Sequence, residues 1–255
     1  MKPRIVVKLG TGVLSRPAGK SLDAAQFKRI ASECAVLRKE YDCILVSSAA
    51  IAAGVRVMGL AGRPDDLPGK QACAAAGQPE LMRLYAASFR KHGVNVAQLL
   101  LTHGDIDSMS QRQNARNTID RLLVNGIVPV INENDSVAVE ELRFGDNDRL
   151  SAEVARLVCS ARLLILTSVD GLQDATGHRI PSVSRMDDAF HLVRPEKGAE
   201  SVGGMQTKLE AIRIACEAGI SSHILDGRKS EQMKMALSGG DVGTVFTVTR
   251  RGRQK

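Results

Sequence analysis

Residues 132 to 152 read NENDSVAVEELRFGDNDRLSA, and they directly follow Gly126-Ile-Val-Pro-Val-Ile131, an apolar run that contains proline and begins with glycine. Such a run is typical of a buried strand, so the polar residues begin where that strand ends. In open parallel α/β sheets, ligands bind beyond the carboxyl ends of the strands. We therefore expect a binding site here, built from carboxylate and amide side chains: Asn132, Asn134, Asp135, Asn147 and Asp148.

A simpler explanation is that Asn, Asp and Gly only form turns. For the single turn from Gly145 to Asp148, this explanation and the functional one are about equally good on local grounds. The two polar clusters together, about twelve residues apart, supply more hydrogen-bond acceptors than turns require, which favours a site.

Apolar runs that resemble strands alternate with helical patterns along the rest of the chain. The expected strands are Arg4–Leu9, Cys43–Ser48, Val94–Leu101, Gly126–Ile131, Arg162–Thr167, Ile220–Leu225 and Thr244–Val248. The expected helices are Leu22–Lys39, Ala49–Gly54, Gly69–Lys91, Gln111–Val124, Arg149–Cys159 and Lys208–Ala218. Pro79 predicts a kink or break in the third helix, and residues 174 to 201 read as irregular. This alternation predicts an α/β protein, a three-layer αβα sandwich around a mainly parallel open sheet.

Composition limits the classes of partner. The 255 residues, 44% of them hydrophobic, are enough for one sizeable α/β domain. Of the formal charge of +7, four units lie in the last six residues, so residues 1 to 249 carry 7 − 4 = +3. That charge suits anionic small molecules, and with 3% aromatic residues and no tryptophan we expect no nucleic-acid binding.

The five cysteines are scattered without a CxxC pair, as expected of thiols in a reducing compartment. No run approaches the roughly 20 apolar residues of a membrane span. We therefore expect a cytoplasmic protein that does not enter a membrane.

Three further segments could hold phosphate. Lys8 precedes the loop Gly10-Thr-Gly12, whose glycines allow the backbone to approach a ligand closely. Because a buried lysine without an anionic partner is costly, the Lys8 side chain either extends out of the core or meets an anion. Ser48 leads into an alanine-rich helix, where an anion site and ordinary N-capping are equally good explanations. Gly203-Gly204 precede a Thr-Lys pair without the spacing of a Walker A loop.

Taken together, these motifs resemble the amino acid kinase family. The matching residues are VVKLGT at 6 to 11, Ser47-Ser48 before AIAAG at 50 to 54, PVINEND at 129 to 135, GDND at 145 to 148 before Leu-Ser-Ala, and GGMQTK at 203 to 208. They occur in the family order and cover nearly the whole chain. The resemblance is strongest to the branch whose acceptor is L-glutamate, and it implies transfer of the γ-phosphoryl group of MgATP to the side-chain carboxylate, the step that opens proline biosynthesis.

The resemblance also implies roles for individual residues. Lys8, Asp148 and Lys208 match the catalytic positions, with the carboxylate orienting both lysines. The glutamate-binding positions are Ser48, Ala49, Asn132, Asp135 and Asn147. The nucleotide-binding positions are Lys8, Gly10, Thr167, Ser168, Val202, Gly203, Gly204, Met205, Gln206, Thr207 and Lys208.

The chemistry of the residues agrees with these roles. Phosphoryl transfer needs positioning and charge neutralisation more than it needs a protein nucleophile. A carboxylate acceptor is already ionised, so no general base is required. Mg²⁺ is often held mainly by phosphates and water, so we expect no metal site made wholly of protein ligands.

Three positions depart from the family pattern. Ala49 stands where glycine is usual, Ser168 where aspartate is usual, and Val202 where threonine is usual. If position 49 needs a positive φ, alanine there costs on the order of 1 kcal/mol, and if it is helical, alanine is harmless. Ser168 keeps a hydroxyl but loses a carboxylate, which affects nucleotide contacts rather than the transfer step.

Two other functions are compatible with the sequence. One is a sister kinase that acts on another carboxylate, carbamate or phosphate acceptor, and the other is a ligand sensor that kept the fold with weakened catalysis. We expect one amino acid kinase domain over residues 1 to 249, a basic tail over 250 to 255, no PUA domain, and a homo-oligomer.

Overall fold

A single open sheet forms the centre of the molecule. The computed structural model describes residues 2–16, 21–137, 147–192 and 204–248. Within these described ranges, eight strands pair in the order β3-β4-β2-β1-β5-β7-β8-β6, and only the pair β7 and β8 is antiparallel. The strands are β1 Arg4–Leu9, β2 Asp42–Ser47, β3 Val96–Leu101, β4 Val128–Glu133, β5 Arg162–Thr167, β6 Ser182–Val183, β7 Ser221–Asp226 and β8 Thr244–Phe246.

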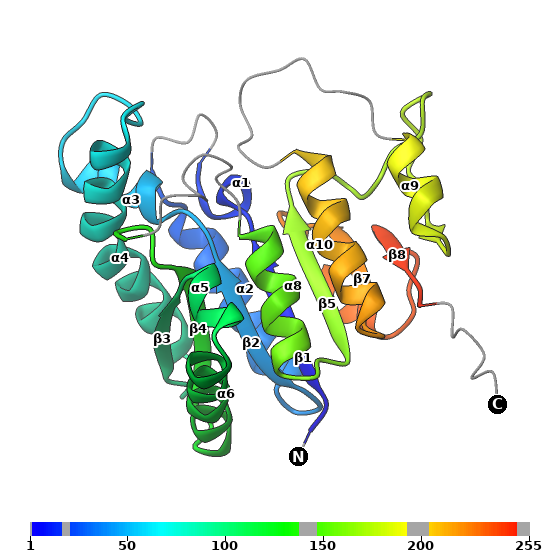
Figure 1. Cartoon of the computed structure of the whole chain (residues 1–255), viewed down its shortest axis with the longest axis horizontal. Coiled ribbons are helices and arrows are strands. Elements are labelled where there is room, and N and C mark those ends of the chain that lie inside the picture. Colours follow the sequence, from blue (N-terminus) through cyan, green and yellow to red (C-terminus); the bar gives the residue numbers. More distant parts are fainter. Residues whose placement is uncertain (1, 17–20, 138–146, 193–203, 249–255) are drawn as a thin grey trace.

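Helices cover both faces of this sheet, which confirms the expected three-layer α/β architecture (Figure 1). One face carries α1 Thr11–Leu14, α2 Ala24–Leu37, α3 Ala50–Val57, α4 Leu67–Arg90 and α11 Gln232–Leu237. The other carries α5 His103–Asp107, α6 Met109–Val124, α8 Asp148–Leu157, α9 Met186–Leu192 and α10 Met205–Glu217. Among the described residues, no helix is both long enough and apolar enough to cross a membrane.

The central strand β1 shows why the sheet is buried on both faces. Ile5, Val7 and Leu9 pack into the core beneath α2 and α4, whereas Val6 packs into the core beneath α8 and α10. Successive side chains of a strand point to opposite faces, so an apolar residue at nearly every position suits a strand covered twice. Lys8 is 1% exposed, so this strand brings a cation into the buried layer.

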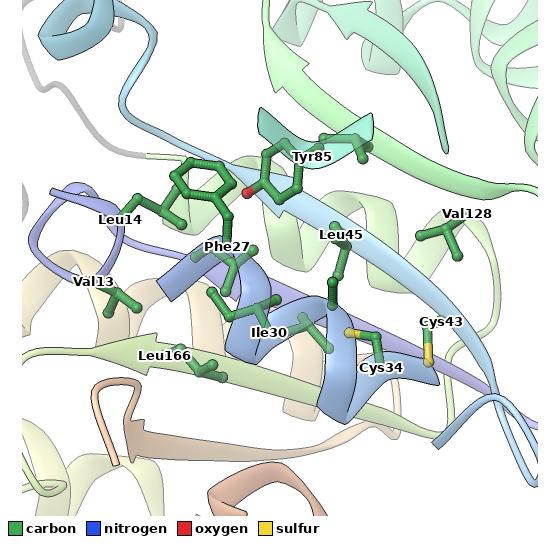
Figure 2. Close-up of a cluster of buried hydrophobic side chains, with 14 of the residues drawn as sticks. Val13, Leu14, Phe27, Ile30, Cys34, Cys43, Leu45, Tyr85, Val128 and Leu166 are labelled. Carbon is green, nitrogen blue, oxygen red and sulfur yellow. The ribbon is translucent and has the colours of Figure 1, made fainter. Parts of the chain in front are cut away.

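The core between the sheet and helices α2 and α4 is mainly aliphatic, and a pair of aromatic rings packs within it (Figure 2). Phe27 of α2 and Tyr85 of α4 are fully buried, and their rings meet edge to face with centroids 4.8 Å apart. Such aromatic pairs contribute about 0.5–1.5 kcal/mol beyond the area they bury. This contact fixes α4 against the sheet near the end of β2.

Helices α3 and α4 touch backbone to backbone through two glycines. A Cβ atom at Gly54 would lie 1.7 Å from the Cys73 carbonyl oxygen, and one at Gly77 would lie 1.9 Å from the Ala50 carbonyl oxygen. Neither position has room for a side chain, because backbone atoms cannot rotate away as side chains do. The contact fixes the start of α3, which follows the end of β2.

Two features of secondary structure differ from the expectation. Of the kink or break expected at Pro79, the break does not occur, because helix α4 runs continuously from Leu67 to Arg90 with this proline inside it. Its apolar face is buried against α2 and α3, and such tertiary packing outweighs the local cost of proline. Residues 174 to 201 were expected to be irregular, but they contain β6 and α9, which are too short to produce a clear periodic pattern.

His223 on β7 should make the fold sensitive to acid. Its side chain is buried, and its Nδ1 atom has no hydrogen-bond partner in the described part of the chain. Burial, with a smaller effect of the nearby Arg162 guanidinium, lowers the pKa of His223 to about 4. The unfolded chain has the ordinary pKa of about 6.5, so between these values it binds more protons than the folded chain. Stability is therefore complete above pH 6.5 and is lost as the pH falls towards 4.

We expect this histidine to lower the free energy of unfolding by about 2 kcal/mol between pH 7.5 and pH 5. Urea denaturation at the two pH values measures the loss of stability. In the His223→Gln protein, this loss should be smaller by the contribution of the histidine. His92→Gln is the matched control, because His92 is exposed. A His223→Gln protein with the same pH dependence as the unaltered chain would contradict the assignment.

Candidate active site

The carboxyl ends of the parallel strands meet at one edge of the sheet, and the candidate residues gather there. Lys8 lies near the end of β1, and the loop after it passes over the lysine: a Cβ atom at Gly10 would lie 3.8 Å from Lys8 Nζ. Asp148 is the first residue of α8, and Lys208 lies in the first turn of α10. Because both helices cover the face of the sheet into which Lys8 points, the three side chains meet.

Asp148 bridges the two lysines. Its Oδ1 atom lies 2.6 Å from Lys8 Nζ, and its Oδ2 atom lies 3.1 Å from Lys208 Nζ and 3.1 Å from Thr207 Oγ1. The carboxylate is fully buried, and both lysines are at least nine-tenths buried. Two ammonium groups against one carboxylate give these side chains a formal charge of +1. Ammonium groups placed in this way can bind the oxygens of a phosphate group.

A second group of polar atoms lies at the ends of β2 and β4, which are neighbours in the sheet. Asn147 donates from Nδ2 to the Ser47 carbonyl oxygen and to Asn132 Oδ1, the latter at 2.6 Å. The same Asn132 oxygen accepts from the Glu133 amide at 3.0 Å. Asn132 Nδ2 and Ser48 Oγ are buried and have no hydrogen-bond partner among the described residues. A buried donor and a buried hydroxyl without partners are the groups that a polar ligand would satisfy.

Ala49 directly follows Ser48 and has a strained backbone. Its φ is +80° and its ψ is 11°, a left-handed conformation that precedes the first turn of α3. Of the two possibilities left open by the sequence, the costly one therefore applies, and we estimate the cost relative to glycine as about 1 kcal/mol. Ala49 is 7% exposed, so its methyl group also occupies buried space beside Ser48.

The remaining acceptor candidate, Asp135, lies in the turn after β4 and is half-buried. The Asn134 amide donates to the Leu101 carbonyl oxygen at 2.9 Å, which ties this turn to the end of β3. Asp135 is thus placed on the same edge of the sheet as Asn132.

The ends of β1, β5 and β7 form the other side of the site. Thr167 is buried, and its carbonyl oxygen accepts from the Gly227 amide at 2.7 Å. Ser168 is exposed and lies opposite Gly12, where an added Cβ atom would lie 3.6 Å from Ser168 Oγ. Arg228 donates from Nε and Nη2 to the Gly12 carbonyl oxygen at 3.0 and 2.7 Å, and so fastens the first loop to β7.

The start of α10 lies next to this edge. Gly204 precedes the helix, and its carbonyl oxygen is 2.9 Å from Thr207 Oγ1. Met205 packs against the core beneath α8 and α10, whereas Gln206 is exposed and donates to Glu210 further along its own helix. Of the predicted nucleotide-binding residues, Val202 and Gly203 lie outside the described residues.

Helix α8 is also held by a contact with the first residue of α5. Glu153 accepts from His103 Nδ1 at 2.8 Å and from Arg149 Nε at 2.9 Å. Burial raises the pKa of Glu153, but the hydrogen bonds from His103 and Arg149 outweigh burial and leave that pKa below its usual value. Since Asp148 begins the same helix, this contact helps to fix the Asp148 carboxylate.

Sequence reasoning did not identify three residues of this site. Ser47 supplies the carbonyl group that Asn147 binds, Tyr85 lies 2.9 Å from Ser47 Oγ, and Arg228 holds Gly12. Ser47 could have been suggested by its neighbour Ser48. Tyr85 and Arg228 stand in no motif that the sequence reading recognised, so no signal pointed to them.

Comparisons with known proteins identify a family and several relatives that resemble this chain. The model of the amino acid kinase family matches residues 3–226. A glutamate 5-kinase of Thermus thermophilus is 44% identical over 98% of this chain and 69% of its own length, and one of Anaeromyxobacter dehalogenans is 45% identical over 95% and 66%. The chain therefore spans about two thirds of the length of these relatives.

Two solved structures share the fold at low sequence identity. A carbamate kinase of Giardia lamblia bound to AMP-PNP has a TM-score of 0.67 at 16% identity, and covers 96% of this chain and 98% of its own. An N-acetylglutamate synthase of Neisseria gonorrhoeae has a TM-score of 0.69 at 15% identity, over 96% of this chain and 59% of its own.

Proposed function

The chain belongs to the amino acid kinase family, and from that premise we propose that it transfers the γ-phosphoryl group of ATP to the side-chain carboxylate of L-glutamate. The product is an acyl phosphate, and the reaction is the first step of proline biosynthesis. The observation that carries this proposal is the juxtaposition of the Lys8–Asp148–Lys208 cluster with the polar group around Ser48 and Asn132.

The acceptor needs no activation by the protein. A carboxylate of L-glutamate is ionised at neutral pH, so its oxygen can attack phosphorus without losing a proton. What remains is to place the two anions together, and the ammonium groups of Lys8 and Lys208 offset their mutual repulsion. Asp148 keeps both ammonium groups at the transferred phosphoryl group. Asp135 and Asn147, with Asn132 and Ser48, bind the amino acid.

ATP lies on the other side of the cluster, along the ends of β1 and β5 and the start of α10. Gly10 and Thr167, with residues 204 to 208 and the exposed Ser168, contact the nucleotide. Mg²⁺ in such reactions neutralises the phosphate oxygens. Both oxygens of Asp148 already face lysines, so the donor set fits an ion held by phosphates and water rather than by this carboxylate.

A hydroxamate assay tests the proposal directly. With ATP, Mg²⁺, hydroxylamine and L-glutamate, the acyl phosphate should be trapped as a hydroxamate. Lys208→Ala should reduce product to background, whereas Lys234→Ala, a change of an exposed lysine on α11, should leave it unaltered. Circular dichroism shows whether each variant is folded.

The same assay distinguishes the acceptors. Substituting N-acetylglutamate, which lacks a free α-ammonium group, should lower kcat/KM by at least about tenfold, because the loss of one charge-assisted hydrogen bond is worth 1.5–3 kcal/mol. Absence of product from L-glutamate, or a higher kcat/KM for another acceptor, would refute the proposal.

A further inference from the structure

Tyr85 lies outside every motif of the family resemblance, yet its hydroxyl group reaches the end of β2. We propose that Tyr85, acting through Ser47, is a positioning residue that holds the Ser48–Ala49 turn in the conformation that presents the Ser48 hydroxyl to the acceptor. The inference rests on the proposed function in one respect, namely that Ser48 contacts L-glutamate.

A chain of hydrogen bonds connects Tyr85 to the turn. Ser47 Oγ donates to the Ser48 carbonyl oxygen at 3.0 Å and lies 2.9 Å from the Tyr85 hydroxyl oxygen. Each hydroxyl group has only one proton to donate. Because Ser47 Oγ donates its proton to the Ser48 carbonyl oxygen, the hydrogen bond between the two hydroxyl groups must be donated by Tyr85 and accepted by Ser47 Oγ. The Ser48 carbonyl belongs to the peptide group directly before Ala49. Tyr85 therefore fixes the orientation of that peptide plane.

Tyr85 is a rigid donor. The residue is fully buried and packs edge to face on Phe27, whose ring lies beside it in Figure 2. Burial raises the pKa of Tyr85, so the phenol keeps its proton throughout the physiological range. Its helix, α4, is in turn fixed against α3 by the contact between Gly77 and the Ala50 carbonyl oxygen.

The other polar groups of the turn are fixed by different residues. The Ser48 amide donates to the Leu9 carbonyl oxygen at 3.1 Å, and the Ser47 carbonyl oxygen accepts from Asn147. With the Ser48 carbonyl bound to Ser47 Oγ, the backbone of Ser48 is fully engaged. Its hydroxyl oxygen is buried without a partner among the described residues, so it is the group left for a ligand.

Ala49 explains why the turn needs such support. Its φ of +80° is freely adopted by glycine but disfavoured for residues with a Cβ atom. Without an external contact on the preceding peptide group, the strain at Ala49 would be relieved by rotation of that group, and Ser48 would move with it. The contribution of Tyr85 should therefore depend on the residue at position 49.

A double-mutant cycle tests this dependence with Tyr85→Phe, Ala49→Gly and the combined variant. Tyr85→Phe alone should raise the KM for L-glutamate about fivefold, as expected for one hydrogen bond, with less than about a twofold change in kcat and in the KM for ATP. With glycine at position 49, the same Tyr85→Phe change should raise that KM by less than about twofold. Thermal unfolding of the four proteins should show the same coupling without any substrate.

Two further variants keep the test decisive. Tyr41→Phe alters the other tyrosine of the chain, which is half-buried in the same core, and should leave both KM values unchanged. Ser47→Ala removes the middle of the hydrogen-bond chain, so it should reproduce the effect of Tyr85→Phe and add nothing to it. If Tyr85→Phe proves poorly folded, the KM of the Ser47→Ala protein for L-glutamate tests the hydrogen-bond chain in its place.

The outcomes separate the inference from the proposed function. If the unaltered chain does not phosphorylate L-glutamate, the proposed function fails, and the unfolding measurements alone decide whether Tyr85 supports the turn. If the unaltered chain is active and Tyr85→Phe changes the KM equally with alanine or glycine at position 49, or not at all, the inference is wrong and the proposed function stands.

Discussion

Replacing Asp148 with asparagine should lower kcat by about a hundredfold or more and change the KM for L-glutamate by less than about threefold. The carboxylate holds Lys8 and Lys208 at 2.6 and 3.1 Å, and a neutral amide cannot draw both ammonium groups to the transferred phosphoryl group. Loss of one preorganised charged contact to a transition state typically costs a hundredfold to a thousandfold in rate. Release of ADP at saturating L-glutamate and ATP measures the effect.

Asp135→Ala provides the contrast to this variant. Asp135 lies in the turn after β4, on the acceptor side, so its loss should raise the KM for L-glutamate at least about tenfold and leave kcat within about threefold. If the two variants changed kcat and KM in the same proportions, the division of the site into an acceptor side and a transfer cluster would be wrong.

Gly77→Ala should lower the free energy of unfolding by about 3 kcal/mol. The added methyl group would lie 1.9 Å from the Ala50 carbonyl oxygen and 2.5 Å from the Gly54 amide nitrogen, so α3 and α4 must separate. Alanine is the better helix former by about 1 kcal/mol, but that gain is smaller than the cost of the clash. Urea denaturation measures the change, and Gly54→Ala should give a similar loss.

Gly62→Ala is the matched control. Gly62 lies in the loop that connects α3 to α4, and a Cβ atom there would meet nothing within 4 Å. It should change the free energy of unfolding by less than about 0.5 kcal/mol. A Gly77→Ala protein as stable as this control would show that α3 and α4 do not need their close approach. Because Ala50 directly follows Ala49, we also expect Gly77→Ala to weaken the binding of L-glutamate.

The sheet was largely predictable from local sequence. The bounds of β1 and β5 agree with the sequence prediction because short apolar runs between polar residues leave little freedom in placing a doubly covered strand. Pro79 does not break helix α4, because the burial of α4 against α2 and α3 is a tertiary effect that local sequence does not show. The small elements β6 and α9 lack enough residues for a periodic pattern.

The site was predictable where its residues stand in motifs. Lys8 and Lys208 were predicted to face the phosphates and Asp148 to orient both lysines, and the structure brings these three side chains together. The conformation of Ala49 could not be chosen from sequence, because both a helical and a left-handed backbone were compatible with the residues around it. The contact of Tyr85 with Ser47 joins residues 38 positions apart and depends on the path of α4, which only the folded structure gives.

The position of β1 in the middle of the sheet has a consequence for biosynthesis of the chain. This strand leaves the ribosome well before one of its two neighbours in the sheet, β5, which begins only at Arg162. Until β5 emerges, one edge of β1 has no native partner, and pairings between such distant segments form slowly. The nascent chain therefore exposes an apolar strand edge until β5 has been synthesised, and we expect its folding yield in the cell to depend on the rate of translation and on chaperones.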